Sequence, residues 1–119
     1  MFPESVEFMG DYLFAYCINL TSVVLPENVK SVGLYSFANC ELLTTINLEN
    51  VEVIKDYAFT SCKSLQNVNL SNIKTIGFGS FASSILSGEY NLNNLESVDS
   101  YAFQNTLISK IEAPNLVYI

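Results

Sequence analysis

The sequence predicts a repeat solenoid, a stack of similar coils that share one continuous core. Phenylalanines recur at almost equal spacing along the whole chain, at Phe14, Phe37, Phe59, Phe81 and Phe103. A second apolar column stands upstream of these anchors at a constant offset, at Val6, Val29, Val51, Ile73 and Leu95. A third lies between the two, at Met9, Val32, Ile54, Ile76 and Val98. A fixed period with several apolar positions indicates that one repeat cannot bury its apolar face alone, whereas a stack of repeats can.

Within each repeat we expect two short extended segments and one helical turn. The segment Leu43–Leu48 and its copy Leu65–Leu70 alternate apolar and polar residues, which is typical of a half-buried strand. The segment Val29–Gly33 brings a second apolar pair, and we expect it to be extended as well. The segment Tyr57–Cys62 is compatible with one helical turn, because its phenylalanine and cysteine are spaced so that they would share a face.

Composition excludes several classes of partner. The chain has 119 residues, half of them hydrophobic, which is enough for one small domain with a continuous core. Twelve acidic residues against five lysines give a net charge of −7, and no segment concentrates positive charge. We therefore expect neither a nucleic acid nor an anionic membrane surface as a partner. The apolar runs are far shorter than the roughly 20 residues that span a bilayer, so we expect no membrane insertion.

The sequence also argues against catalysis. It contains no histidine, arginine or tryptophan, and its acidic residues are spread over the repeats instead of converging. The usual triads and metal centres are therefore unavailable. We expect no enzyme activity, no catalytic residues, no cofactor and no metal.

The repeat unit resembles a known family. Leu25–Val29, followed by Val32–Cys40 and then Leu43, is similar to the BspA-type (Treponema pallidum-type) leucine-rich repeat, and the resemblance covers essentially the whole chain. It implies a leucine-rich repeat solenoid with short parallel strands and short helical turns, in which five repeats each span about 22–23 residues. The fourth repeat departs most from the pattern, because Gly79 replaces the tyrosine and Ser84 the cysteine.

Polar residues on the outward side of the Leu43–Leu48 type of strand form the first candidate site. Amide columns of this kind are commonly structural ladders, and the alternative is a polar binding surface on the sheet. The candidate interaction face consists of Thr45, Asn47, Asn67, Asn69, Glu89 and Asn91.

Tyrosines just before the phenylalanines form a candidate aromatic flank, interrupted by Gly79. This stripe is either a binding platform, since tyrosine is favoured at interfaces, or a cover of stacked rings along the side of the solenoid. Its members are Tyr12, Tyr35, Tyr57 and Tyr101.

Two further columns have structural interpretations. Cys17, Cys40 and Cys62 should stack on successive coils, and we expect buried free thiols, because Ser84 and Thr106 fill the same position in the later repeats. A disulfide is the alternative, because the expected spacing of about 4.8 Å between coils is compatible with one. A column of alternating charge predicts exposed pairs between coils, or else a solvated face, and consists of Glu7, Lys30, Glu52, Lys74 and Glu96.

The resemblance and the repeat phase together suggest a function. From the repeat phase we expect residues 1–119 to form a single array that is truncated within a repeat at both ends, with exposed core layers and possible end-to-end self-association. The family resemblance implies a protein-interaction, adhesin-like module of a secreted or cell-surface protein. The alternatives are a passive structural spacer or a carbohydrate-binding surface, and the alternative location is the cytoplasm.

Overall fold

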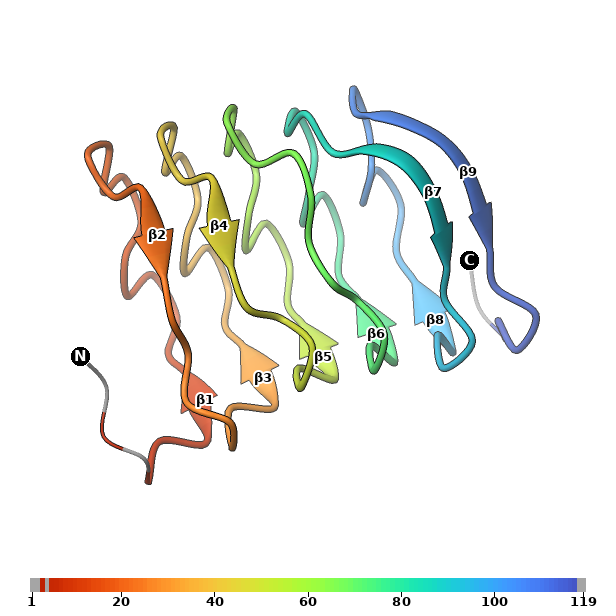
Figure 1. Ribbon diagram of the computed structural model, residues 1–119, viewed down its shortest axis with the longest axis horizontal. Helices are drawn as coiled ribbons and strands as arrows, with labels where there is room; N and C mark the ends of the chain where they lie inside the picture. The colour runs from red at the N-terminus through yellow and green to blue at the C-terminus, as the bar shows by residue number, and fades with distance from the viewer. Residues whose placement is uncertain (1–2, 4, 118–119) are drawn as a thin grey trace.

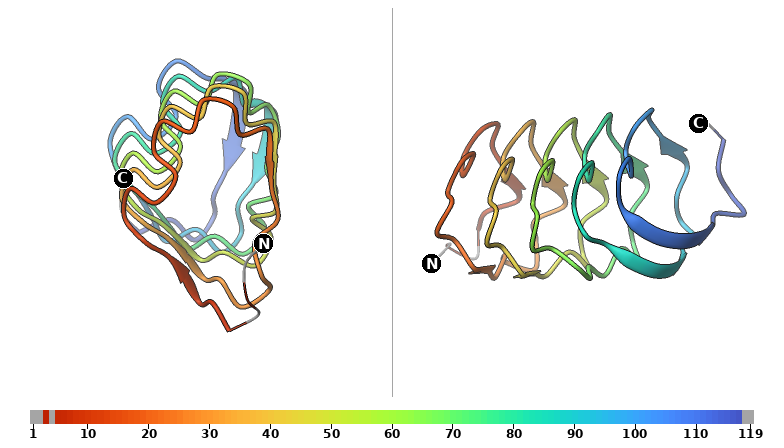
Figure 2. Two further views of the ribbon diagram at one scale, coloured as in Figure 1. Left: turned by 90° about the vertical axis from the view of Figure 1, so that its left-hand side faces the viewer. Right: turned by 90° about the horizontal axis from the view of Figure 1, so that it is seen from above.

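The structure is a computed structural model that describes residues 3 and 5–117. Successive coils follow one another along the longest axis, with coil 1 at one end and coil 5 at the other (Figure 1 and Figure 2). We define coils 1 to 5 as residues 6–28, 29–50, 51–72, 73–94 and 95–117. The predicted solenoid of regularly repeating coils with parallel strands is thus confirmed.

The first wall is a continuous parallel sheet with one strand from every coil. Each strand has an outward and an inward residue, and the inward residues belong to the third apolar column of the sequence. The register is direct, with Val32 paired to Ile54 and Ile54 paired to Ile76. In spatial order the strands are β1 (Phe8–Met9), β3 (Ser31–Val32), β5 (Val53–Ile54), β6 (Thr75–Ile76) and β8 (Ser97–Val98).

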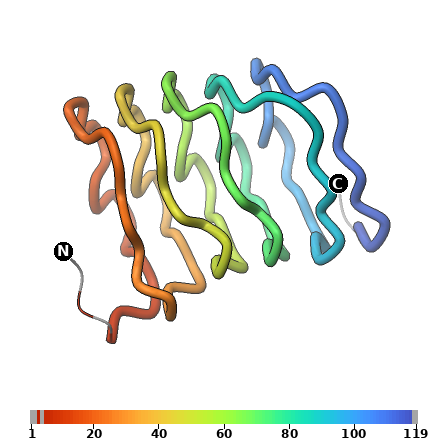
Figure 3. Tube along the Cα trace, in the orientation of Figure 1, coloured from red at the N-terminus to blue at the C-terminus, as the bar shows by residue number. Residues whose placement is uncertain are grey.

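The second wall is interrupted. β2 (Ser22–Val23) pairs with β4 (Thr45–Ile46), and β7 (Ser87–Asn91) pairs with β9 (Leu107–Glu112), in two separate two-stranded parallel sheets. Coil 3 contributes residues 66–70, which belong to neither sheet. Figure 3 follows the same path along the chain trace. The polar columns of the sequence therefore lie on a wall that changes its pairing at coil 3.

The third side of each coil is a series of turns, and the helical turn expected at Tyr57–Cys62 is wrong. Within the part of the chain that the structure describes there is no helix. The φ angles of Tyr57 and Ser61 are 58° and 56°, which no right-handed helix accepts. The Phe59 N–H donates to the Ser80 carbonyl of coil 4 at 2.7 Å, whereas the Thr60 N–H donates to the Tyr57 carbonyl at 3.2 Å. Alternate N–H groups thus bind the next coil and their own turn.

Left-handed backbone recurs at the tyrosine position of every coil and again shortly after the phenylalanine. A left-handed L-residue costs roughly 1–2 kcal/mol, so the hydrogen bonds between coils must offset this cost repeatedly. Gly79 occupies the tyrosine position of coil 4 with a φ of 59° and adopts it without that cost. The departure of the fourth repeat from the sequence pattern is therefore compatible with its backbone.

The phenylalanines form the centre of the core. Consecutive rings stack with centroids 5.2 to 5.7 Å apart, and Phe37, Phe59 and Phe81 are fully buried. Offset stacking at this distance is favourable beyond the apolar area that it buries. The column that led to the fold prediction is the ladder that holds adjacent coils together.

Beside this ladder lie two buried hydroxyl groups without a hydrogen-bond partner, on Ser36 and Ser80. Ala58 and Ala102 occupy the same position in coils 3 and 5. Because an unsatisfied buried hydroxyl carries a desolvation cost of about 1–3 kcal/mol, Ser36→Ala and Ser80→Ala should each raise the free energy of unfolding by about 1 kcal/mol. Urea denaturation measures this, with Ser31→Ala on the outward side of β3 as the control. A loss of stability in both core variants would contradict the assignment.

Candidate functional site

The candidate interaction face lies on the second wall, as the alternation predicted, but its residues come from separate segments. Thr45 lies in β4, Glu89 and Asn91 lie in β7, and Asn67 and Asn69 lie in the unpaired segment of coil 3. All five are exposed, whereas Asn47 is half-buried. The wall presents these side chains together without joining their backbones into one sheet.

Asn47 is part of the scaffold. The Leu25 N–H donates to Asn47 Oδ1 at 2.6 Å, and Asn47 Nδ2 donates to the Leu25 carbonyl at 2.9 Å. The side chain thus satisfies both backbone groups of a residue in coil 1. Asn69 acts locally, because its Oδ1 accepts the Ser71 N–H at 3.0 Å. The asparagines of this column therefore do not form the amide ladder considered from the sequence.

Four members of the face have uncommitted side chains. Within the described part of the chain no hydrogen bond or ion pair holds the side chains of Thr45, Asn67, Glu89 and Asn91. Their polar atoms are exposed to solvent and remain available to a partner.

A different amide column, which the sequence reasoning missed, does join the coils. Asn72 Nδ2 donates to the Glu49 carbonyl at 2.7 Å, Asn94 Nδ2 to the Ser71 carbonyl at 3.0 Å, and Asn115 Nδ2 to the Asn93 carbonyl at 2.7 Å. The donors follow one another once per coil, and Asn28 and Asn50 occupy the corresponding positions of the sequence in coils 1 and 2. Aligning the asparagines in the way that the phenylalanines were aligned would have found this column.

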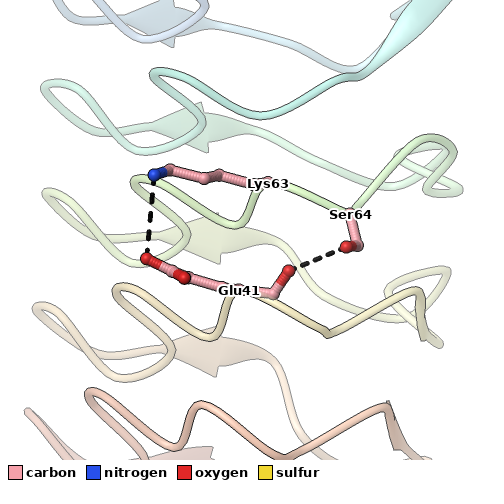
Figure 4. Close-up of polar contacts among 3 residues, drawn as sticks. All are labelled: Glu41, Lys63 and Ser64. Carbon is pink, nitrogen blue, oxygen red and sulfur yellow. Dashed lines mark hydrogen bonds and ion pairs between the residues drawn. The ribbon is translucent and has the colours of Figure 1, made fainter.

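Contacts at the start of the second wall join coil 2 to coil 3. Figure 4 shows the Lys63 ammonium directed at the Glu41 carboxylate, with Nζ and Oε2 3.7 Å apart, and the Ser64 hydroxyl donating to the Glu41 carbonyl at 2.7 Å. The ion pair is exposed and contributes little to the free energy of folding. The hydrogen bond from Ser64 to Glu41 joins coils 2 and 3 at the point where the turns end and the second wall begins.

The tyrosine flank is a stacked cover. Tyr12 and Tyr35 stack with centroids 4.9 Å apart, and Tyr35 and Tyr57 with centroids 4.8 Å apart. The stripe continues past Gly79, because Phe78 packs edge-on between Tyr57 and Tyr101. Stacking covers the ring faces inside the column and leaves edges and hydroxyl groups to solvent. The arrangement therefore offers no free aromatic plane between neighbouring tyrosines.

The cysteines are free thiols, as the sequence predicted. Cys40 and Cys62 are buried and Cys17 is half-buried. Cys40 Sγ donates to the Phe14 carbonyl and Cys62 Sγ to the Phe37 carbonyl, both at 3.1 Å. In the later repeats the same position holds Ser84, whose hydroxyl accepts the Leu86 N–H at 3.4 Å, and Thr106, whose hydroxyl donates to the Phe103 carbonyl at 2.8 Å. Burial raises the pKa of Cys40 to about 11 and that of Cys62 to about 12.

The alternating charges are in register, but they pair only in part. The Lys74 N–H donates to the Glu52 carbonyl at 2.8 Å, and the Lys74 ammonium lies 3.6 Å from the Glu52 carboxylate. Among the described residues the other neighbours in this column form no ion pair within 4.0 Å. The column is mostly a solvated face.

Residues 3 and 5–117 contain neither a metal cluster nor a membrane-spanning helix. No group of three or more histidine, cysteine, aspartate or glutamate residues could hold a metal ion in this part of the chain. None of its segments is a helix long and apolar enough to cross a bilayer.

Comparison with known proteins identifies the class. The stacked coils define a leucine-rich repeat solenoid, and the BspA type leucine rich repeat region matches residues 7–119 in six copies. The chain therefore belongs to the BspA-type leucine-rich repeat family. Proteins that share this architecture are repeat modules that generally serve in protein interaction.

Two solved structures share the fold. A leucine-rich repeat protein from T. pallidum is 28% identical with a TM-score of 0.76, and the match covers 84% of this chain and 48% of that one. A leucine-rich repeat protein from Bacteroides ovatus is 24% identical with a TM-score of 0.52, covering 93% and 42% of the two chains. The chain thus spans about half the length of these proteins. No curated protein sequence matches it.

The different roles of the asparagines can be separated by mutation. Asn47→Ala should lower the free energy of unfolding by about 1–3 kcal/mol, because both Leu25 backbone groups lose their partner. Asn91→Ala should change it by less than about 0.5 kcal/mol, because nothing in the described chain binds that side chain. Urea denaturation of the two variants gives the comparison. Equal losses would show that Asn47 does not hold coil 1.

The thiols should differ in reactivity with an aromatic disulfide reagent. At pH 8 in the folded chain, Cys17 should react while Cys40 and Cys62 stay protected, because burial shields them and holds their pKa values near 11 and 12. All three should react at once in denaturant. Because folding raises both pKa values, their stabilising contribution is complete below about pH 8.5 and is lost as the pH rises toward 11 and 12. Rapid native reaction of all three would exclude the buried column.

Proposed function

We propose that the chain is a protein-interaction module of an adhesin-like, secreted or cell-surface protein, and that the second wall makes the contact. The family supports the general role, since its repeats generally mediate protein interaction. The observation that carries the choice of wall is its set of uncommitted polar side chains, Thr45, Asn67, Glu89 and Asn91. The other two sides offer less, because the tyrosines stack on one another and the first wall presents mostly small residues.

The net charge of the chain favours one class of partner surface. With a net charge of −7, the chain attracts basic protein surfaces and repels acidic ones. The second wall of five coils is a small interface, so further repeats would enlarge the contact. The two solved structures that share the fold are about twice as long as this chain, which leaves room for such repeats.

End-to-end self-association belongs to the same proposal. Coil 1 exposes Phe8, Leu13 and Ile18, and coil 5 exposes Leu107 and Val117. Apolar side chains on the outermost coils favour stacking of one array on another. Sedimentation over a range of concentrations measures this association directly.

The binding role can be tested with two matched triple variants. Asn67→Ala, Glu89→Ala and Asn91→Ala together change the second wall without touching Asn47. The control combines Ser31→Ala, Thr75→Ala and Ser97→Ala on the first wall. The wild-type chain, immobilised on a sensor, is exposed to an array of purified extracellular proteins.

We expect the second-wall variant to bind the captured protein at least about tenfold more weakly, equivalent to about 1.4 kcal/mol, while the control binds as the wild type does. If wild type and both variants bind equally well, the second wall is not the contact surface. If the wild type captures nothing from the array, the result favours a passive spacer.

A further inference from the structure

One edge of β7 has no strand beside it. β7 pairs with β9 alone, and Gly88 opposite Ile108 is followed by Glu89 opposite Lys110. The extra residue of this irregularity therefore lies in β9, whereas β7 has no extra residue and departs from extended backbone at Gly88, whose φ is 87°. Successive residues of a strand direct their backbone N–H and C=O groups to opposite edges, so the hydrogen bonds at the two ends of β7 show which residues face which edge.

The hydrogen bonds show which residues of β7 face coil 3. The Leu107 N–H donates to the Leu86 carbonyl and the Leu92 N–H donates to the Glu112 carbonyl, so the even-numbered residues face β9. The Ser87 N–H donates instead to the Gln66 carbonyl of coil 3.

Glu89 and Asn91 alternate in phase with Ser87 and therefore face coil 3 with their backbone groups. Within residues 5–117 no backbone hydrogen bond joins either of them to coil 3.

Coil 3 is equally open on its side of this gap. The Val68 N–H donates to the Tyr90 hydroxyl at 3.4 Å, and not to a backbone group of β7. The Tyr90 side chain thus lies between coil 3 and β7, at a place where two paired strands would stand about 4.8 Å apart. Figure 1 shows β7 bending away from coil 3 and running beside β9.

We define the seam as the interval between residues 66–70 and Ser87–Asn91. The bond from Ser87 to Gln66 closes one end, and the bond from Asn94 Nδ2 to the Ser71 carbonyl closes the other. Between them lie two unpaired backbone edges, bridged in the described chain by the side chain of Tyr90.

We propose that the seam is a strand-addition site, at which an extended peptide segment of a partner protein pairs with the backbone of Glu89 and Asn91. The proposal rests on the proposed function and names the mode of binding on the second wall. An unpaired strand edge recognises extended backbone by main-chain hydrogen bonds, and the neighbouring side chains select the sequence. Asn67 and Asn69 border the seam on one side, and Glu89 and Asn91 on the other.

The charges at the seam favour a basic side chain in the incoming segment. Glu89 is exposed and forms no ion pair with the described residues. Lys110 stands opposite Glu89 in the register of β9, yet its ammonium lies 3.2 Å from the Glu112 carboxylate. The asparagines that border the seam are neutral. A lysine or arginine in the segment would therefore meet an unpaired carboxylate.

The displaced contact is weak. A separation of 3.4 Å is long for a hydrogen bond from N–H to hydroxyl, so exchanging it for a backbone carbonyl of the peptide costs little. Tyr90 is half-buried and packs against the core, which lets its ring remain in place while its hydroxyl gives up the Val68 N–H.

The test uses a synthetic hexapeptide with the sequence of β9, LISKIE, blocked at both ends. This sequence already pairs in parallel with one edge of β7 and contains a lysine. Titration into the 15N-labelled chain should shift and protect the amides of Val68, Glu89 and Asn91. A peptide N-methylated at alternate residues, which lacks the necessary donors, should bind at least tenfold more weakly.

Two variants of the chain separate backbone from side-chain recognition. Glu89→Pro removes an N–H that faces the seam and is not used by β9, a position where proline is tolerated in a strand, and it should abolish peptide binding while circular dichroism stays unchanged. Glu89→Gln keeps the backbone donor and should bind with reduced affinity and a smaller dependence on salt. If Glu89→Pro binds the peptide as the wild type does, or if only β9 amides shift, the seam is not the site.

This failure can be told apart from failure of the proposed function. A protein captured from the array that binds Glu89→Pro normally but loses affinity for the second-wall triple variant would leave the second wall as the contact and overturn strand addition. If that protein loses affinity for both variants, the two proposals stand together.

Discussion

Hydrogen bonds between the backbones of successive coils are the constraint on which this structure depends, because no helix in the described chain satisfies these groups within a coil. The Phe59 N–H reaches Ser80 in the turns, and the Lys74 N–H reaches Glu52 beside the first wall. Such bonds hold neighbouring coils in register. Residues at equal positions then stack on one another, which produces the phenylalanine ladder, the tyrosine cover and the column of thiols.

The same constraint explains why the second wall opens between coil 3 and β7. The fourth repeat is shorter by a single residue between its cysteine position and its strand, so Ser87 meets Gln66 one position short of the usual repeat interval. The strand that follows cannot keep the register of coil 3, and it pairs with β9 instead. The missing residue thus lies directly before the interval in which the backbone edges of coil 3 and β7 stay unpaired.

Much of the fold could be predicted from the sequence, because apolar columns report directly on which residues stack. The inward residues of the first wall and the phenylalanine core followed from spacing, and the free thiols from the serine and threonine that fill the same position in later repeats. The helical turn at Tyr57–Cys62 did not, because spacing says which side chains share a face and nothing about the sign of φ at Tyr57. Ring stacking and hydrogen bonds to the next coil offset the conformational cost of left-handed backbone at tyrosine.

The candidate face was predicted less completely. Its location on one wall followed from alternation, but Asn47 and Asn91 look alike in sequence and differ in role. Asn47 has Leu25 beneath it in a position to be bound at both backbone groups. The opening of the seam depends on where one residue is missing, and the sequence shows this because Leu86 follows its cysteine position one residue sooner than Leu65 does. It also depends on how the backbone rearranges around the missing residue, which only the structure shows.

Native-state hydrogen exchange of the individual amides tests the central claim most directly. Stacking of coils predicts slow exchange at Phe37, Phe59 and Phe81, whose N–H groups bind the next coil, and fast exchange at Asn67 and Asn69 in the unpaired segment. The protection should therefore recur once per coil and lapse in the second wall of coil 3. Equal protection of Asn67 and Phe59 would contradict the account.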